Sequence, residues 1–321
     1  MTASGSKAAT FAIAAACAIA LGACGDSEDD AKAPSGSAAN GKTMTVQVAG
    51  REVSSDPQLA EKVPAKVRDS GTLTGAGTLP YPPWAVIDAD APGGVAGVQP
   101  DLATAIAAKL GLKFEFKKTS YEGFVPGLQA GQYNAITASL GDTEERHEVM
   151  TFVDSFRIAS AFLVLKGNPA GLSNLDSACG KHLTVTTGSR QLAYVEEQQK
   201  VCEQAGKPKI KLTQFPEAPQ AVLAVETKRV DGMLGDKVAL GEVAKGNTKL
   251  EMTSSDEDFG VALVGTAFDK GDAELVQAYA TAQQALIEDG TYKAILDHYD
   301  LGFAALEESL VNGEPLSASG S

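Results

Sequence analysis

Apolar and polar residues along the chain follow two periods, one typical of helices and the other typical of strands. Leu102, Ile106 and Leu110 are apolar at helical spacing, and Gly111 follows where a helix C-cap is expected. Residues 113–117 instead alternate with a period of two, as a strand does. Strand and helix patterns alternate in this way through most of the chain, which predicts an α/β fold with largely parallel sheets.

The predicted elements form two consecutive sets, before and after the turn-rich residues 167–172. No segment recurs at a period of about 20 to 50 residues, which excludes a solenoid. The strands are predicted at residues 72–78, 113–117, 134–140, 161–166, 183–187, 210–215, 230–234 and 259–264, and the helices at residues 100–110, 121–130, 189–205, 218–227, 273–287 and 292–298, with a further helix beginning at Lys237.

The composition narrows the classes of function. A chain of 321 residues is long enough for two domains, since a domain usually contains about 100 to 200 residues. The net charge is −14 and the basic residues are scattered, so we expect no nucleic-acid partner. The three histidines and four cysteines lack the spacings of a metal site or of a Cys/His nucleophile. We therefore expect no bound metal and no cofactor.

The N-terminal residues form a predicted targeting signal. Lys7 precedes the apolar residues 8–23, a run shorter than the about 20 residues of a membrane-spanning helix and typical of a secretory signal peptide. The run ends in Leu-Gly-Ala-Cys, which resembles a bacterial lipobox. The resemblance implies cleavage of residues 1–23 and a lipidated Cys24 at the outer face of the cell membrane. An ordinary signal peptide cut nearby is the alternative.

Two further segments contain few large apolar side chains. Residues 24–44 are mostly Gly, Ser, Ala, Asp and Glu, a composition that cannot offset the conformational entropy lost on folding, and they are predicted to be a flexible tether. Residues 307–321 are rich in Gly, Ser, Ala and Glu and are predicted to be a disordered tail.

Seven short segments of the chain are informative when taken together and in this order: residues 81–84, 97–111, 121–131, 139–146, 180–189, 229–236 and 287–299. They resemble the periplasmic or lipid-anchored substrate-binding proteins of polar amino-acid ABC importers, solute-binding protein family 3. The resemblance implies a two-lobed α/β fold of the periplasmic-binding-protein type II, with the ligand in the cleft between the lobes. It also implies a permease with its ATPase as partner.

The resemblance also implies how the chain is divided between the lobes. Lobe 1 is expected to be discontinuous, with residues 45–163 and 262–306, and lobe 2 is expected at residues 164–261. Two crossover hinge strands are expected near residues 163–166 and 259–262. Because hinges are few and lie where the chain changes lobe, closure is expected to be close to a rigid-body rotation.

Two residues are expected to bind the charged ends of an amino acid. The resemblance implies that Arg146 binds the carboxylate, to which a guanidinium presents a planar fork; the alternative is an arginine on a helix surface. It implies that Asp236 binds the ammonium group, and the strand before Asp236 ends where open α/β sheets place their ligands. Asp236 is also a favoured N-cap residue for the helix that begins at Lys237, and both roles are compatible.

Four more residues are expected around the same groups. Ser139 lies near the carboxyl end of a predicted strand, from which its hydroxyl reaches the ammonium or carboxylate group. Gly141 stands where many relatives have Ser or Thr, so only backbone contacts are expected there. Ser189 and Arg190 begin a helix whose free N–H groups favour anions, and we expect them to add donors from lobe 2.

Three aromatic residues, Tyr81, Trp84 and Tyr121, match family positions that form walls around the aliphatic part of the ligand. Loop packing is the alternative for Trp84. Tyr121 matches a position usually held by Phe, so its hydroxyl either contacts the ligand or faces solvent. Relatives that bind cationic amino acids have acids near the first strand and the aromatic loop. Here that strand ends in Thr78 and the acids near the loop are expected to be exposed, so the sequence favours a polar or uncharged amino acid.

Cys179 and Cys202 remain when Cys17 is assigned to the signal peptide and Cys24 to the lipid anchor. In an oxidising location we expect a disulfide between them that joins a helix to the sheet. Two buried free thiols are the alternative.

These features together predict a monomeric extracytoplasmic lipoprotein that binds an amino acid by cleft closure and delivers it to an ABC importer, without catalysis. One alternative is a dehydratase-like enzyme on the same fold, which requires an acid/base pair beside a roomy pocket. Asp236 argues against it, because a ligand without an amino group gives that carboxylate no partner. A protein that senses the ligand and signals to a receptor is the second alternative.

Overall fold

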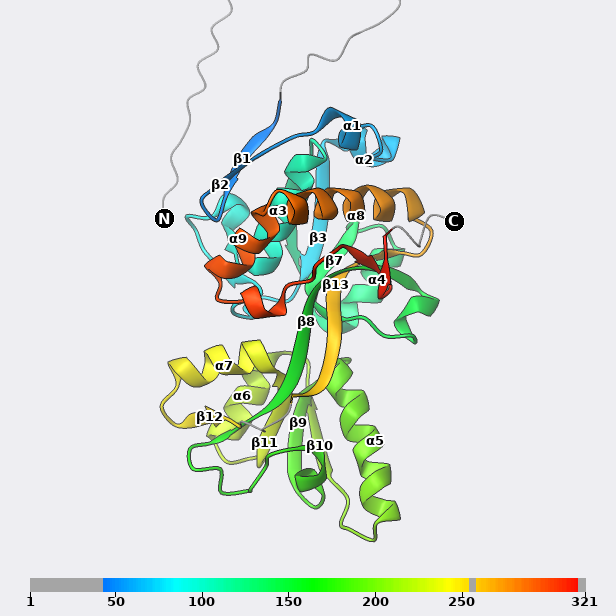
Figure 1. The fold of residues 1–321 in the computed structure, drawn as a ribbon. Helices are drawn as coiled ribbons and strands as arrows, with labels where there is room; N and C mark the ends of the chain where they lie inside the picture. Colours follow the sequence, from blue (N-terminus) through cyan, green and yellow to red (C-terminus); the bar gives the residue numbers. More distant parts are fainter. Residues whose placement is uncertain (1–42, 254–257, 317–321) are drawn as a thin grey trace, which may run out of the picture. The chain divides into compact units, whose positions relative to one another are not determined.

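The computed structural model describes residues 43–253 and 258–316, which form two lobes connected through one mixed sheet (Figure 1). The strand order is β10-β9-β11-β8-β13-β7-β3-β6, and the long strands β8 (Met150–Leu165) and β13 (Phe259–Asp269) belong to both lobes. This arrangement confirms the predicted two-lobed α/β fold. The predicted signal peptide, Cys24 and nearly all of the predicted tether lie outside the described residues.

In lobe 1, strand β3 (Thr72–Gly77) pairs in parallel with both β6 (Lys113–Lys118) and β7 (Ala135–Gly141). Every residue of β7 is buried, as expected for a strand with neighbours on both sides in a mostly parallel sheet. Two short hairpins complete the strands of this part of the lobe: β1 (Thr45–Val48) with β2 (Arg51–Ser54), and β4 (Val86–Ile87) with β5 (Val95–Ala96).

Helix α3 (Val98–Lys109) lies in the centre of lobe 1. It contacts α8 (Ala273–Glu288), α9 (Thr291–His298), β6 and the first hairpin, and its alanines permit these close approaches. The helix ends where the sequence predicts, and Gly111 has a φ of +72°, the left-handed conformation that the predicted cap needs. The other helices are α1 (Pro57–Ala60), α2 (Ala65–Ser70) and α4 (Phe124–Gln129), with the 3₁₀ turns η1 (Pro92–Gly94), η2 (Tyr121–Gly123), η3 (Arg146–Glu148) and η5 (Gly302–Ala304).

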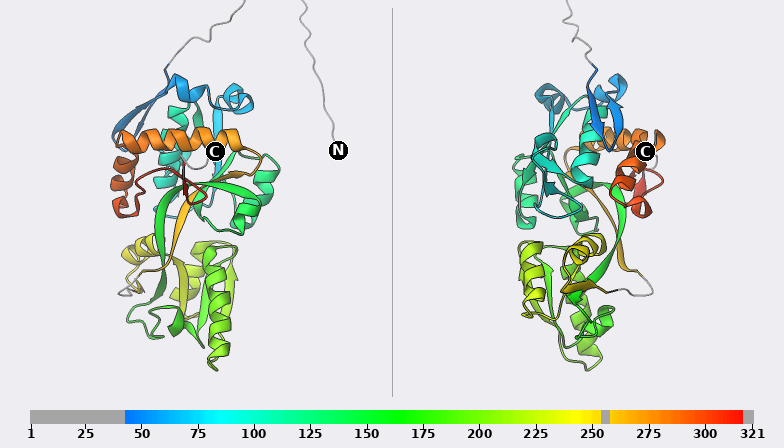
Figure 2. Two further views of the ribbon diagram at one scale, coloured as in Figure 1. Left: turned by 45° about the vertical axis from the view of Figure 1, so that its right-hand side comes forward. Right: turned by 90° about the vertical axis from the view of Figure 1, so that its left-hand side faces the viewer.

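The late helices α8 and α9 return to lobe 1 and lie beside the earliest described residues (Figure 2). Arg51 Nη2 donates to the backbone oxygen of Asp289 at 3.0 Å, and Lys109 pairs with the Asp289 carboxylate at 3.1 Å. Lobe 1 is therefore built from both ends of the described chain.

In lobe 2, β9 (His182–Thr186) pairs in parallel with β10 (Lys211–Phe215) and β11 (Gly232–Asp236). The second half of β8 pairs antiparallel with β11. The short β12 (Leu250–Met252) in turn pairs antiparallel with β8. Three helices pack on it, α5 (Arg190–Gln204), α6 (Ala218–Glu226) and α7 (Lys237–Gly246), and the 3₁₀ turn η4 (Leu175–Ala178) precedes β9.

The chain changes lobe earlier along β8 than the sequence predicts. β8 pairs with β13 in lobe 1 up to Ile158 and with β11 in lobe 2 from Ser160 onward, so the crossing lies there rather than at residues 163–166. In β13, Phe259 pairs with Ser160 and Ala262 with Ile158, with a register shift between them. Gly260 lies in this shift with a φ of +57°.

The predicted disordered tail is wrong for residues 307–316, which are ordered. Strand β14 (Leu310–Val311) pairs with β15 (Glu314–Pro315) and with Val153 and Asp154 of β8. Ser309 is fully buried, and its hydroxyl accepts a hydrogen bond from Gln283 at 3.2 Å. Residues 317–321 lie outside the described residues.

A disulfide joins Cys179, just before β9, to Cys202 in the last turn of α5, with the Cα atoms 5.6 Å apart. The predicted pairing is therefore confirmed. By the chain-entropy argument, a bridge across 23 residues stabilises lobe 2 by about 3 kcal/mol. None of the helices in residues 43–253 and 258–316 has the length and apolar character needed to span a membrane.

Candidate functional site

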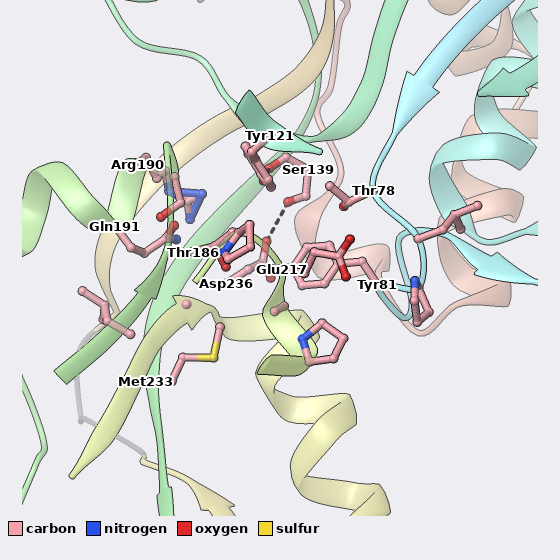
Figure 3. A pocket seen from close by; sticks show the side chains of 18 residues that line it. Thr78, Tyr81, Tyr121, Ser139, Thr186, Arg190, Gln191, Glu217, Met233 and Asp236 are labelled. Carbon is pink, nitrogen blue, oxygen red and sulfur yellow. Dashed lines mark hydrogen bonds between the residues drawn. The ribbon is translucent and has the colours of Figure 1, made fainter. Parts of the chain in front are cut away.

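A pocket lies between the lobes, where parallel strands from both lobes end (Figure 3). Thr78 follows β3 and Ser139 lies near the end of β7 in lobe 1. Thr186 ends β9, Glu217 follows β10 and Asp236 ends β11 in lobe 2. The carboxyl ends of parallel strands are where open α/β sheets bind ligands, and here two such edges contribute to one pocket.

Asp236 makes polar contacts in both lobes. It is 3% exposed, and its Oδ1 accepts from the backbone N–H groups of Val238 and Ala239 at 2.9 and 3.1 Å, which makes it the N-cap of α7. Its Oδ2 accepts from the Ser139 hydroxyl of lobe 1 at 2.8 Å, the bond drawn in Figure 3. Burial raises the pKa of Asp236, while Arg190 and these hydrogen bonds act in the opposite direction. The predicted capping role is present, and the second oxygen faces the pocket.

Two polar atoms in the pocket wall have no partner. Arg190 is 6% exposed, and its Nη2 donates to the backbone oxygens of Ile158 and Ala159 at 3.3 and 3.4 Å, where β8 changes lobe. Its Nε and the hydroxyl of the adjacent Ser189 are buried and have no hydrogen-bond partner among the described residues. A buried donor without an acceptor costs about 1–3 kcal/mol, so an acceptor supplied by a ligand would be stabilised here.

Arg146 and Gly141 lie behind this wall rather than in it. Arg146 Nη1 donates to the Gly141 oxygen at 2.5 Å, and Nη2 donates across the lobes to the Gly188 oxygen at 2.8 Å. Arg146 lines a neighbouring cavity of about 590 Å³, which Tyr121 and Arg190 also line. A Cβ at position 141 would lie 2.8 Å from Arg190 Cδ and 3.6 Å from Arg146 Nη1. Glycine at this position therefore makes room for Arg190.

The three aromatic candidates have different environments. Tyr81 lines the pocket, where burial and then Asp236 raise the pKa of its hydroxyl. Tyr121 also lines the pocket, but its hydroxyl donates to the backbone oxygen of Ser139 at 2.9 Å, which neither predicted alternative anticipates. The wall role of Trp84 is wrong: Trp84 is 1% exposed and packs on Phe156 in the core of lobe 1, with ring centroids 5.3 Å apart.

Little space remains between these side chains. The cavity measures about 30 Å³, room for one or two water molecules, against about 590 Å³ for the neighbouring cavity. The Ser139–Asp236 and Arg146–Gly188 hydrogen bonds both join lobe 1 to lobe 2 beside it. An amino acid can therefore enter only when the lobes move apart, and these two contacts are the ones that must separate.

Four polar residues of the pocket were not predicted from the sequence: Thr78, Thr186, Gln191 and Glu217. Thr78, Thr186 and Glu217 each end or follow a strand of the two parallel arrays, so the strand-end argument that selected Asp236 also applies to them. Gln191 donates to the Ser160 hydroxyl at 3.2 Å, a tertiary contact that has no sequence signal. Within the described part of the chain no cluster of His, Cys, Asp and Glu could hold a metal ion.

A comparison of the sequence with known proteins agrees with a pocket between two lobes. The sequence profile of the bacterial extracellular solute-binding proteins, family 3, matches residues 73–302, which is more than half of the chain. The chain belongs to this family. Members of family 3 are extracytoplasmic binding proteins for transport, and the relatives described next are named for amino acids.

The arginine-binding protein ArgT of Corynebacterium glutamicum is 28% identical over 265 residues, which cover 81% of this chain and 84% of ArgT. The lysine/arginine/ornithine-binding periplasmic protein of Escherichia coli is 28% identical over 65% of this chain and 81% of its own length. Among solved structures, an ancestral arginine-binding protein bound to arginine is 31% identical with a TM-score of 0.64, covering 71% of this chain and 98% of that protein. The family profile covers most of the two-lobed body and begins at residue 73.

Proposed function

We propose that this family 3 protein binds a free amino acid between its lobes and delivers it to the permease of an ABC importer with its ATPase. One observation carries the proposal: a buried guanidinium N–H and a buried hydroxyl without partners lie in the same pocket as the buried carboxylate of Asp236. An α-amino acid presents a carboxylate and an ammonium group a few bonds apart, and a dry cleft must pair both charges.

In this proposal the ligand carboxylate accepts from Arg190 Nε and the Ser189 hydroxyl. Arg146 lies next to Arg190 beside Gly141, outside the pocket, and its terminal nitrogens stay bound to backbone oxygens. The ligand ammonium group donates to Asp236 Oδ2, which the Ser139 hydroxyl now occupies. The ligand thus displaces the Ser139 hydroxyl from Asp236 while bound to lobe 2, and the lobe 1 side chains of the same pocket, Tyr81 and Tyr121, contact it when the lobes close, which is how its binding energy favours closure.

We further propose that the binding cycle involves no chemical reaction. Asp236 gives an ammonium group a partner, and a dehydratase acting on a ring without an amino group would leave that carboxylate unused. We propose that the protein is secreted, acts as a monomer and is held at the outer face of the cell membrane by a lipidated Cys24, as the Leu-Gly-Ala-Cys sequence predicts.

The test is a thermal-shift screen of the full-length chain against the twenty amino acids, ornithine and citrulline. A ligand at 100 times its Kd adds about 2.7 kcal/mol to the free energy of unfolding and raises Tm by several degrees. The matched control is the α-carboxamide of each amino acid that raises Tm. It lacks the α-carboxylate and should leave Tm unchanged. If no amino acid raised Tm, or if the amides were equally active, the proposal would be overturned.

A further inference from the structure

We propose that Glu217 selects the ligand by pairing with a positive charge on its side chain, so that the protein binds a cationic amino acid. This inference rests on the proposed function and names its substrate class. It differs from the expectation drawn from the sequence, which considered acids near the first strand and the aromatic loop of lobe 1. Glu217 comes from the other lobe.

Glu217 lines the pocket at a fixed position. It is the residue before α6, between Pro216 and Ala218-Pro219, and the proline rings restrict the backbone on both sides of it. Its side chain is half-buried and makes no capping bond to α6. Among the described residues its carboxylate has no hydrogen-bond or ion-pair partner. The structural role that would otherwise account for an acid at this position is therefore absent.

The charges of the pocket do not balance. The charged side chains that line it are Arg190, Asp236 and Glu217, and Arg190 acts electrostatically on Asp236. A zwitterionic ligand adds one positive and one negative charge, so a neutral side chain would leave the Glu217 carboxylate unpaired in a closed cleft. A cationic side chain brings the total to zero and pairs with this half-buried carboxylate, which a bound ligand would shield further from water.

Arg146 does not supply the missing positive charge. It lies outside this pocket, and its two terminal nitrogens donate to Gly141 and Gly188 oxygens. Asp142 and Glu145 lie within its electrostatic reach and offset its charge.

The remaining surface near Glu217 suits the aliphatic stem of a long cationic side chain. Figure 3 shows Glu217 on the same side of Asp236 as Tyr81, whereas Arg190 lies on the other side. Tyr81 and the rings of Pro80, Pro216 and Pro219 line this part of the pocket. Lysine and arginine cover such apolar surface with their methylene groups, and an aromatic face also attracts the cation itself.

The experiment compares arginine with citrulline, which has nearly the same shape without the charge. Calorimetric titration of the full-length wild-type chain should give a Kd for arginine at least tenfold lower than for citrulline. Glu217→Gln should raise the Kd for arginine at least tenfold, equal to about 1.4 kcal/mol, and change the Kd for citrulline by less than about threefold. The Kd values for lysine and ornithine should respond to Glu217→Gln as the Kd for arginine does.

Glu203→Gln is the matched control. Glu203 lies on α5 of the same lobe, is exposed and pairs only with exposed Lys209 at 3.2 Å, so the variant removes an equal charge outside the pocket. It should leave the affinity for arginine unchanged, and both variants should keep the Tm of the ligand-free protein within about 2 °C.

The outcomes separate the two proposals. Binding of amino acids without preference for a positive side chain, or an arginine affinity unchanged in Glu217→Gln, would overturn the role of Glu217 and leave the proposed function intact. An equal loss of affinity for arginine and for citrulline in Glu217→Gln would also overturn the role of Glu217, because the effect would then not depend on the charge of the ligand side chain. Binding of no amino acid at all would overturn both.

Discussion

Arg190 and Arg146 both lie next to Gly141, and of the two only Arg190 has a fully buried donor without a partner among the described residues. Each terminal nitrogen of Arg146 already donates a hydrogen bond to a backbone carbonyl. At the scale of single residues, the structure therefore favours Arg190 as the main carboxylate ligand, whereas family resemblance favours Arg146.

Arg190→Ala should weaken amino-acid binding by at least 100-fold, because it leaves the ligand carboxylate buried without its charged donor. Arg146→Ala should weaken binding less, by about tenfold, because the variant loses one interlobe hydrogen bond and a more distant charge. Titration calorimetry measures both, with Arg229→Ala at an exposed position of lobe 2 as the control. A larger loss in Arg146→Ala than in Arg190→Ala would return the carboxylate role to Arg146.

The sequence identified those pocket residues whose position follows from local rules. It failed for residues whose surroundings depend on partners that are distant in the sequence. Asp236, Ser139, Ser189 and Arg190 lie at strand ends or helix starts, which are visible in the pattern of the chain. The burial of Trp84 depends on Phe156, far away in sequence, and no local pattern reveals it. The same is true of the Tyr121 hydroxyl, whose acceptor is the backbone of β7.

Strand β8 shows the same limit at the scale of secondary structure. The sequence predicts only residues 161–166, whereas the strand covers Met150–Leu165. Asp154 and Ser155 interrupt the apolar run in the sequence, yet both are buried, where Gly313 bonds one oxygen of Asp154 and Gln283 bonds the Ser155 hydroxyl. Strands 72–77 and 182–186 and helix α5 follow their predicted ranges closely, since their period and end signals are local.

The hairpin β14–β15 covers a carboxyl group whose ionisation opposes folding. Asp154 Oδ2 accepts from the Gly313 N–H at 2.9 Å, in the turn of that hairpin, and Asp154 is fully buried. Burial, and then the neighbouring Asp142, raise the pKa of Asp154 to about 8. The folded chain thus holds a proton that the unfolded chain releases at much lower pH.

Because the folded-state pKa is raised, the stabilising contribution of Asp154 is complete below about pH 4 and is lost as the pH rises toward 8. Over that pH range, ionisation of Asp154 should lower the free energy of unfolding by up to about 1.4 kcal/mol per pH unit. Asp154→Asn keeps an acceptor for Gly313 and should flatten the dependence, measured by urea unfolding from pH 5 to pH 8. Exposed Asp69→Asn is the control, and equal slopes in Asp154→Asn and wild type would contradict this account.

Movement of the whole molecule depends on the two strands that cross between the lobes. Gly260 lies at the crossing of β13 with a φ of +57°, and a Cβ there would meet Tyr194 Cε2 at 2.7 Å and Ser160 Oγ at 3.0 Å. Ser160 accepts from Gln191 in the pocket wall, so the crossing and the pocket share a hydrogen bond.

Gly260→Ala should lower the free energy of unfolding by about 1–3 kcal/mol and also weaken amino-acid binding, because the strained crossing disturbs the closed arrangement. Thermal unfolding and titration calorimetry measure the two effects. Gly206→Ala is the matched control: Gly206 has a φ of +67° in the same lobe, but no atom lies within 4 Å of its added Cβ. Gly206→Ala should lose stability without losing affinity. Equal affinities for the two variants would show that the crossing does not influence the pocket.

Lobe 2 is an insertion within lobe 1, since the described chain begins with β1 and finishes with β15, both on lobe 1. A fluorescent label or immobilising tag attached near β1 or near β15 would therefore travel with lobe 1. A pair of dyes at these two positions would register no change when the cleft closes. A biosensor made from this protein needs one reporter within lobe 2, for example on the exposed face of α5.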